Sequence, residues 1–107
     1  MNTLESYFLD DSDLIKSKIR QRRAQMLVHS CIYYSMNTNI VDDDTWQRWA
    51  NELSDLQREN PDCCKISFYD KAFVDWTGDS GAFLPLRDRW VRYKAQQLLD
   101  TWEKFND

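Results

Sequence analysis

Residues 31–62 read CIYYSMNTNIVDDDTWQRWANELSDLQRENPD, and this stretch decides the fold. It predicts the end of one helix, a short loop rich in Asn and Asp, and a second amphipathic helix that Pro61 stops. Asp42 or Asp43 can cap the second helix. Its apolar side chains recur at helical spacing, and they are Trp46, Trp49, Ala50, Leu53 and Leu56. Because the connection is so short, we expect the two helices to form an antiparallel pair.

The sequence before this loop predicts the first helix of the pair. Ser12 or Asp13 can cap it, and it runs to about Met36, where Asn37, Thr38 and Asn39 break the pattern. One apolar stripe marks its buried face, formed by Ile15, Ile19, Met26 and Tyr33.

The second half of the chain is less regular. Five apolar side chains at helical spacing predict about two turns of helix: Phe68, Tyr69, Ala72, Phe73 and Trp76. Residues 77–81 hold both glycines and predict a loop, and residues 66–68 are the only weak candidate for a strand. Asp88 can cap a last helix whose inward side chains are Trp90, Val91, Ala95, Leu98, Leu99, Trp102 and Phe105.

These patterns predict an all-α fold in one domain spanning residues 1–107. The domain is built on the antiparallel helix–loop–helix pair at about residues 13–62. Residues 63–107 add a short helix, a glycine-containing loop and a long final helix, and they complete the core.

Composition sets limits on location and partners. Among 107 residues, 42% are hydrophobic and 14% aromatic, which is too much apolar surface for a disordered chain. No apolar run reaches membrane-spanning length, and the acidic start MNTLESYFLDDSD lacks the pattern of a signal peptide. We therefore expect a cytoplasmic protein whose three cysteines, Cys31, Cys63 and Cys64, stay reduced. The net charge of −4 argues against direct nucleic-acid binding over a broad surface.

One basic run interrupts this acidic balance. It consists of Lys16, Lys18, Arg20, Arg22 and Arg23, and it follows Asp10, Asp11 and Asp13. Two interpretations stay open: a small patch for phosphate or an acidic partner, or the solvated face of a helix whose N-terminal end favours carboxylates.

Complete catalytic and metal-binding motifs are missing from the sequence. A single His29 cannot build a histidine-based metal site, and the adjacent Cys63 and Cys64 are not spaced for tetrahedral chelation. The acidic triplet 42–44 lacks the alternating ligands of a calcium loop. We expect no metal, no required cofactor and no enzymatic activity.

The helix pair carries a second pattern beyond its apolar face. Tyr33-Tyr34 closes the first helix, Asp43 follows in the loop, and Trp46-Gln47 opens the second helix. Glu52-Leu53, Leu56 and Pro61 complete the series. From about residue 16 to 62 this arrangement resembles, without gaps, the small helical N-terminal domain of bacterial NAD-dependent DNA ligases. In that family the helical hairpin closes over the nicotinamide mononucleotide half of NAD.

The resemblance implies a binding site formed by Tyr33, Tyr34, Asp43, Trp46 and Gln47, with NAD or nicotinamide mononucleotide as ligand. Aromatic faces hold a cationic nicotinamide ring, and a carboxylate accepts hydrogen bonds from ribose or carboxamide groups. Tyr34 stands where the family has His, and Gln47 stands where it has a second Asp, which removes a negative charge. Judged by spacing alone, an aromatic residue at position 46 belongs more often to the core than to a ligand site.

The ligase reaction itself needs a nucleophilic lysine in a Lys-x-Asp-Gly motif. Neither Lys71, in Asp-Lys-Ala-Phe, nor Lys94, in Tyr-Lys-Ala-Gln, matches this motif. The remaining ligase domains have no room in 107 residues. The chain is therefore not predicted to be a self-sufficient ligase.

The whole chain also resembles small proteins of tailed phages and prophages of Gram-positive bacteria. This resemblance rests on segments such as Leu27-Val28-His29-Ser30, Tyr69-x-Lys71-Ala72-Phe73 and Lys94-Ala95-Gln96-Gln97. It implies a phage accessory protein that reuses the ligase hairpin.

Three functions compete. The first is a non-catalytic interaction protein that modulates or inhibits a host or phage protein, for example an anti-CRISPR protein. Its carboxylates would compete for a basic groove, and they are Asp10, Asp11, Asp13, Asp42, Asp44, Asp55 and Glu59. The second is a binder of NAD or nicotinamide mononucleotide. The third is an accessory subunit of a separate ligase. The wide stripe on the final helix is compatible with a homodimer.

Overall fold

The computed structural model describes residues 11–106, and within this range the chain is all-α. The described range contains three α-helices: α2 (Asp11–Ser35), α3 (Asp43–Glu59) and α4 (Arg89–Phe105). Two 3-10 turns, η1 (Pro61–Cys63) and η2 (Lys71–Phe73), lie between α3 and α4. No strand occurs among the described residues, so the weak strand candidate at 66–68 is not one. The expected all-helical fold is confirmed.

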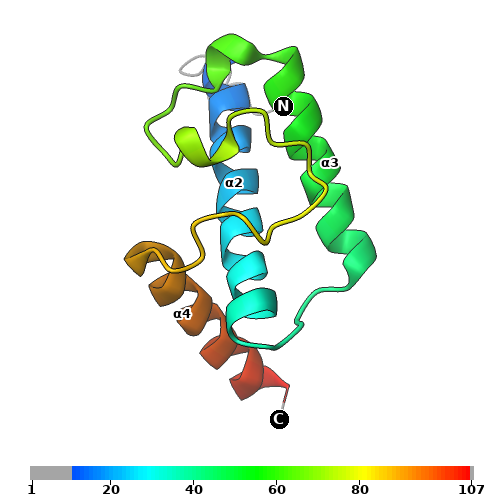
Figure 1. The fold of residues 1–107 in the computed structure, drawn as a ribbon, viewed down its shortest axis with the longest axis vertical. Coiled ribbons are helices and arrows are strands. Elements are labelled where there is room, and N and C mark those ends of the chain that lie inside the picture. Colours follow the sequence, from blue (N-terminus) through cyan, green and yellow to red (C-terminus); the bar gives the residue numbers. More distant parts are fainter. Residues whose placement is uncertain (1–10, 107) are drawn as a thin grey trace, which may run out of the picture.

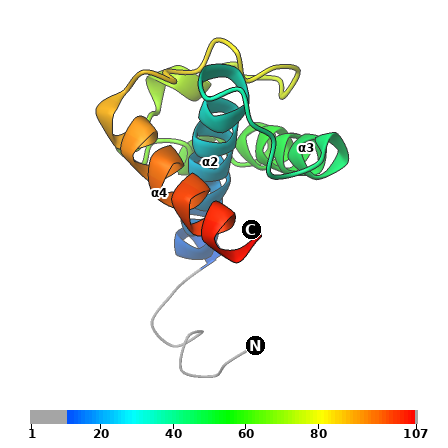
Figure 2. The same ribbon diagram turned by 90° about the horizontal axis from the view of Figure 1, so that it is seen from below.

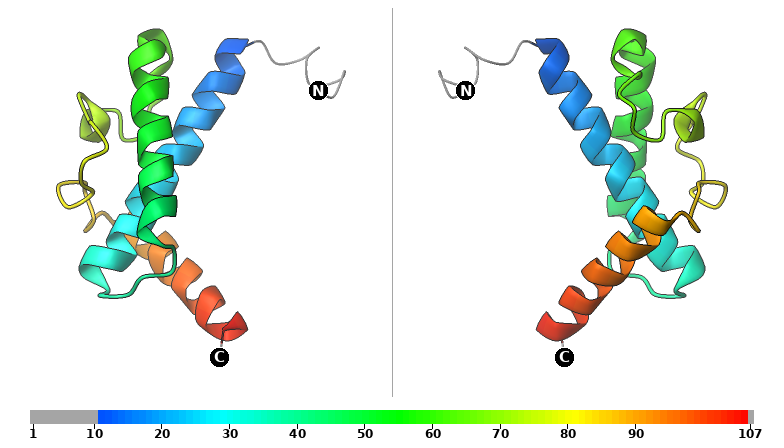
Figure 3. Two further views of the ribbon diagram at one scale, coloured as in Figure 1. Left: turned by 90° about the vertical axis from the view of Figure 1, so that its right-hand side faces the viewer. Right: turned by 90° about the vertical axis from the view of Figure 1, so that its left-hand side faces the viewer.

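Helix α2 is the central element, and both other helices pack against it (Figures 1 and 2). Helix α3 runs back beside α2 in the opposite direction, and the two helices diverge toward one end (Figure 3). The antiparallel pair predicted from the sequence is thus confirmed. The core between the helices is made mostly of α2 side chains and their partners, including Ile19, Met26, Leu27, Cys31, Ile32, Ala50, Leu53, Val91 and Ala95.

The loop between α2 and α3 forms because its residues end one helix and cap the next. Asn37 adopts a left-handed conformation with φ of 55°, which Asn tolerates better than most residues and which stops α2. The side chain of Asp42 then accepts a hydrogen bond of 2.7 Å from the backbone N–H of Thr45 and caps α3. At the other end of the pair, Ser12 and Asp13 lie inside α2, so the prediction that either caps it is wrong.

The apolar face of α3 is buried as its spacing predicts, but to different depths. Ala50 and Leu53 are completely buried, whereas the larger Trp46, Trp49 and Leu56 are only partly buried. These larger side chains pack at the edge of the core. Irregular chain from the second half covers part of this edge (Figure 1).

The segment between η1 and α4 is not the two-turn helix that its aromatic spacing predicts. Only the single 3-10 turn η2 forms there. Ser67, Tyr69 and Asp75 each have a φ between 54° and 57°, and this left-handed conformation cannot continue a right-handed helix. Residues 77–81 form an irregular loop, as predicted.

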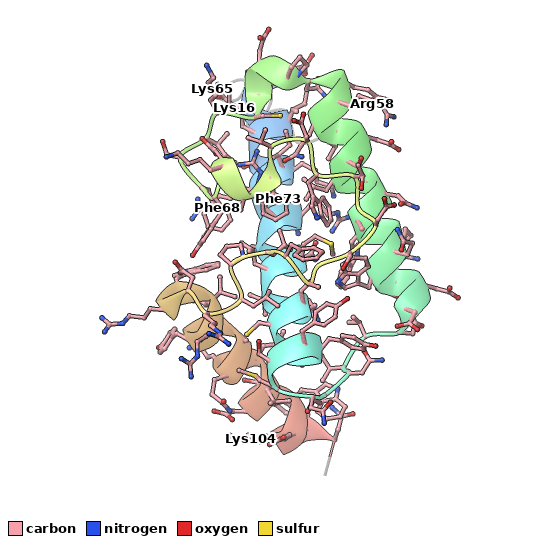
Figure 4. All side chains as sticks on the ribbon, viewed as in Figure 1. Lys16, Arg58, Lys65, Phe68, Phe73 and Lys104 are labelled. Carbon is pink, nitrogen blue, oxygen red and sulfur yellow. The ribbon has the colours of Figure 1, made fainter. Side chains whose placement is uncertain are left out.

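Arg23 organises this irregular segment from the middle of α2. Its guanidinium is 1% exposed and donates four hydrogen bonds of 2.7–2.9 Å. The acceptors are the side chains of Gln57 and Asp70 and the carbonyl oxygens of Cys64 and Phe68. Phe68 and Phe73 lie beside the N-terminal half of α2 (Figure 4), and the Arg23 guanidinium is 5.5 Å from the centroid of the Phe73 ring. A buried cation is tolerated here because its donors are used by nearby acceptors.

Asp70 links the Arg23 cluster to the local backbone. Its carboxylate also accepts hydrogen bonds of 3.1–3.3 Å from the backbone N–H groups of Ile66, Ser67 and Phe68. Burial acts to raise the pKa of Asp70, but the hydrogen bonds from Arg23 and from this backbone outweigh it, so the pKa is lowered. The charged carboxylate therefore fixes the turn at 66–70 and ties it to α2.

Helix α4 begins as predicted but leaves its last turn uncovered. Asp88 caps it by accepting a hydrogen bond of 3.1 Å from the backbone N–H of Trp90. Val91, Ala95 and Leu99 are buried against α2. Two side chains predicted to face inward do not: Trp102 is exposed, and Phe105 is 79% exposed. The C-terminal end of α4 projects beyond the other described helices (Figure 3), and the side chains of its last turn are exposed.

Two further sequence expectations concern cysteines and membranes. Cys31, Cys63 and Cys64 are all free thiols, and burial raises the pKa of Cys31 and of Cys64. None of the helices described in residues 11–106 is long and apolar enough to cross a lipid bilayer.

Candidate functional site

A pocket of about 170 Å³ lies where α2 ends and α3 begins. In Figure 1 this is the end of the helix pair marked by the cyan turns of α2. Residues from α2, from the α2–α3 loop, from the first turns of α3 and from the glycine-containing loop share its lining. They are His29, Tyr33, Tyr34, Asn39, Ile40, Val41, Asp43, Trp46, Gln47, Asp79 and Ser80.

The structure brings all five predicted binding residues to this one pocket. Tyr33 and Tyr34 come from the last turns of α2, and their rings meet edge to face with centroids 4.8 Å apart. Each tyrosine is about half exposed, at 51% and 49%. The assignment of Tyr33 to the buried stripe of α2 is therefore wrong, because the ring lies at the pocket and not in the core. Asp43, Trp46 and Gln47 approach from the start of α3.

Trp46 contributes to both the pocket and the core. Its indole N–H donates a hydrogen bond of 3.3 Å to Ser30 Oγ, a completely buried group of α2. Its ring also meets Trp76 edge to face, with centroids 6.4 Å apart. The two interpretations of this residue are therefore compatible, since one part of the ring packs inward while another lines the pocket. These contacts fix the ring and leave it little freedom to follow a ligand.

Sequence reasoning missed the contribution of the loop at 76–81. Gln47 Nε2 donates hydrogen bonds of 3.1 Å to the carbonyl of Gly78 and 3.0 Å to the side chain of Asn51. Ser80 lies 3.4 Å from the Tyr34 hydroxyl, within hydrogen-bonding distance. Asp79 lies in the sequence between Gly78 and Ser80, the two residues held by these contacts. Its carboxylate accepts a hydrogen bond of 2.9 Å from the Thr77 hydroxyl. The loop thus places Asp79 in the lining of the pocket.

The two glycines were the available signal for this loop. A Cβ on Gly81 would lie 2.8 Å from Ser30 Cβ and 3.2 Å from Trp46 Cζ2. Gly78 has a φ of 85°, which favours glycine, and its Cα position faces the backbone of Ala50. Both glycines allow the loop to lie directly on the crossing of α2 and α3. Isolated glycines often mark such a close backbone approach.

The charged groups of the pocket are all acidic. Asp43 and Asp79 are exposed carboxylates, and no Lys or Arg occurs among the described residues that line it. His29 adds no positive charge at neutral pH, because burial lowers the pKa of its imidazole. The pocket therefore combines aromatic rings with uncompensated negative charge, which suits a cationic aromatic group.

His29 is a partly buried residue with one fully buried polar atom. Its Nδ1 atom is buried and has no hydrogen-bond partner among the described residues. The ring lies 5.3 Å from the ring of Trp49, between the pocket and the surface of α2 that faces α4. An imidazole in this position is favoured in its neutral form.

We expect the free energy of unfolding to fall as the pH drops below about 6.5, the ordinary pKa of histidine. The folded-state pKa of His29 lies below the unfolded value, so between these two pKa values the unfolded chain binds more protons. The stability contributed by neutral His29 is complete above the unfolded pKa and is lost as the pH falls toward the folded one. Urea unfolding monitored at a series of pH values measures this slope.

The control for this pH effect is the His29→Phe variant. His29 is the only histidine in the chain, so the variant should lose the slope near pH 6 and keep the acid unfolding of the carboxylates at lower pH. An unchanged slope near pH 6 in the variant would show that another group is responsible.

The basic run on α2 does not form one uniform surface. Arg23 is buried, and Arg22 forms an ion pair of 2.7 Å with Glu52 of α3. The Arg20 guanidinium lies over the ring of Phe68, 4.0 Å from its centroid. The run is therefore neither a uniform patch for phosphate nor a fully solvated helix face. Several of its cations make contacts within the fold instead.

The acidic groups proposed as a broad mimic of nucleic acid are also divided. Asp42 caps α3, and Asp55 forms an ion pair of 2.7 Å with Arg58. Asp10 lies outside the described residues. Within residues 11–106, no group of three or more His, Cys, Asp or Glu side chains is arranged to hold a metal ion.

Comparisons with known proteins return no match: no family model, no curated protein and no solved structure is similar to this chain.

Proposed function

We propose that this protein is a non-catalytic binding protein that captures the nicotinamide end of NAD or of nicotinamide mononucleotide. The observation that carries the proposal is the convergence of Tyr33, Tyr34, Asp43, Trp46 and Gln47 on one pocket. These five residues were chosen from the resemblance to ligase domains. That they line one pocket is a separate observation on the structure.

The size and chemistry of the pocket support a ring-sized ligand group. Pockets for whole drug-sized ligands typically measure about 300–1,000 Å³. At about 170 Å³, this pocket suits one aromatic ring with its substituents and leaves the rest of a nucleotide in solvent. Tyr33 and Tyr34 offer aromatic surface that is not used by the core, and Asp43 offers a carboxylate to ribose or carboxamide donors.

Binding of nicotinamide mononucleotide by isothermal titration calorimetry tests this proposal. We expect saturable binding in the micromolar range, weakened about tenfold or more by Asp43→Asn and by Tyr33→Ala, since each variant removes one group of the pocket. Asp55→Asn is the matched control, because it removes a carboxylate on α3 that does not line the pocket. Absence of heat at millimolar ligand, or equal affinity in all variants, would contradict the proposal.

An interaction protein of phage origin is the second candidate function. One observation favours it, namely the uncovered apolar end of α4 with Trp102 and Phe105. An exposed apolar surface of this kind is typical of a contact site for a protein partner or a second copy of the chain. Acidic mimicry of nucleic acid has less support, because Asp55 is paired with Arg58 and Asp42 is used to cap α3. If no nicotinamide compound binds, the end of α4 becomes the surface to test.

A further inference from the structure

We propose that the pocket recognises the positive charge of an aromatic ring and excludes phosphate, so that its ligand class is the N-substituted aromatic cation, with nicotinamide riboside sufficient for full affinity. This inference rests on the proposed function and makes it more specific. It assigns a binding role to Asp79, which belongs to the second half of the chain and has no counterpart in the ligase resemblance.

The charge of the lining is the first observation behind this inference. Asp43 approaches from the first turn of α3, and Asp79 approaches from the loop at 76–81. A cationic ring that contacts a tyrosine ring and lies near the two carboxylates gains attraction from both kinds of group. A neutral ring of the same shape would keep the stacking and lose the charge attraction. The pocket should therefore distinguish an oxidised, cationic nicotinamide from its reduced, neutral form.

The position of the cations in the fold is the second observation. Lys16, Lys65 and Arg58 lie at the end of the helix pair where α2 begins and α3 ends, whereas Lys104 of α4 lies toward the opposite end (Figure 4). The pocket lies at the other end, and none of its described lining residues is Lys or Arg. Arg48, one turn into α3, interacts electrostatically with Asp42 and is not part of the lining. A phosphate held against the lining itself would thus meet carboxylates and no Lys or Arg among the described lining residues.

The anchoring of Asp79 is the third observation. On one side of it, Gln47 holds the carbonyl of Gly78, and on the other side Trp76 Nε1 donates a hydrogen bond of 3.1 Å to the carbonyl of Ser80. The carboxylate is additionally held by the Thr77 hydroxyl. The position of this charge is therefore fixed before a ligand arrives, which reduces the entropy cost of binding.

Calorimetry at low ionic strength with three related probes tests this inference. The probes are nicotinamide riboside, its reduced dihydro form, and nicotinamide mononucleotide. We expect the riboside to bind about tenfold more tightly than the reduced form, as expected for a cation–π contact and two partly screened carboxylates. The mononucleotide should bind no more tightly than the riboside.

Two matched variants locate the charge recognition. Asp79→Asn keeps an acceptor for the Thr77 hydroxyl and removes the charge, so the preference for the cationic form should fall several-fold. Asp75→Asn makes the same change four positions earlier at a residue outside this lining, and Asn tolerates its φ of 54°. This control should keep the full preference.

The outcomes separate the inference from the function on which it rests. If none of the three probes binds, both the proposed function and this inference are wrong. If the mononucleotide binds more than about tenfold more tightly than the riboside, or the reduced form binds equally well, the pocket binds nicotinamide but the charge recognition is wrong. If Asp79→Asn leaves the preference unchanged, the role assigned to Asp79 is wrong.

Discussion

Replacing Arg23 with Met should lower the free energy of unfolding by about 3–5 kcal/mol, the range expected when one partner of a buried charged network is removed. The variant keeps most of the volume of the side chain. It leaves the carbonyl groups of Cys64 and Phe68 without the Arg23 donor and removes the cationic partner of the Asp70 carboxylate. Domains of this kind are stabilised by only about 5–15 kcal/mol, so this single change removes a large share of the total. Urea unfolding followed by circular dichroism measures the loss.

Two further variants show whether the network, and not simply a charge on α2, is responsible. Lys18→Met removes an exposed cation from the same helix and should change the stability by less than about 0.5 kcal/mol. Arg23→Lys should recover only part of the loss, because one ammonium group cannot supply the planar fork of donors that reaches four acceptors. A loss below about 1 kcal/mol in Arg23→Met would contradict the central role given to this residue.

Gly81→Ala should destabilise the protein by about 1–3 kcal/mol and also weaken ligand binding. The new methyl group would lie 2.8 Å from Ser30 Cβ, which belongs to a completely buried residue of α2 and cannot move away freely. Overpacking of this kind forces a neighbouring segment to shift. Because Ser30 is held inside α2, the loop at 76–81 would have to give way, and its displacement would carry Asp79 and Ser80 away from the pocket. Chemical unfolding and calorimetry with nicotinamide mononucleotide measure the two effects.

A double-mutant cycle tests the cause of the Gly81 effect. Ser30→Gly removes the group with which the new methyl collides, at the separate cost of a glycine inside a helix, about 1 kcal/mol. In the double variant Ser30→Gly/Gly81→Ala the two losses should not add, because the collision is absent. Fully additive losses would show that the close contact between Gly81 and Ser30 does not limit the packing.

The helix pair could be predicted from the sequence because its information is local. The spacing of Trp46, Ala50 and Leu53, the cap at Asp42 and the break at Asn37 act within a few residues. The last helix followed the same rules up to Leu99. In its final turn, Trp102 and Phe105 are exposed although their spacing predicts burial. The spacing of apolar residues in one helix does not show how far a neighbouring helix extends.

The irregular second half could not be predicted in the same way. The spacing of its aromatic residues suggested a helix, whereas its backbone is set by hydrogen bonds from Arg23, which lies more than forty residues earlier in the chain. The left-handed conformations of Ser67, Tyr69 and Asp75 occur at residues with no special preference for them, apart from Asp. Tertiary contacts determined this segment, and local propensity did not.

The pocket combines residues that local sequence could predict with residues that only tertiary contacts bring into place. Its five residues on the helix pair were available from the resemblance and from helical spacing. Asp79 and Ser80 were not, because the contact between Tyr34 and Ser80 joins positions forty-six residues apart. The basic run on α2 was visible in the sequence, but nothing local distinguished the buried Arg23 from the exposed Lys18.

Nuclear magnetic resonance of the backbone amides during titration with nicotinamide riboside tests the central claim most directly, because it reports the place of binding as well as its existence. We predict chemical-shift changes that saturate and that concentrate in residues 29–47 and 77–81, with α4 unaffected. Changes confined to the end of α4, or no change at millimolar ligand, would contradict the assignment of this pocket as a nicotinamide-binding site.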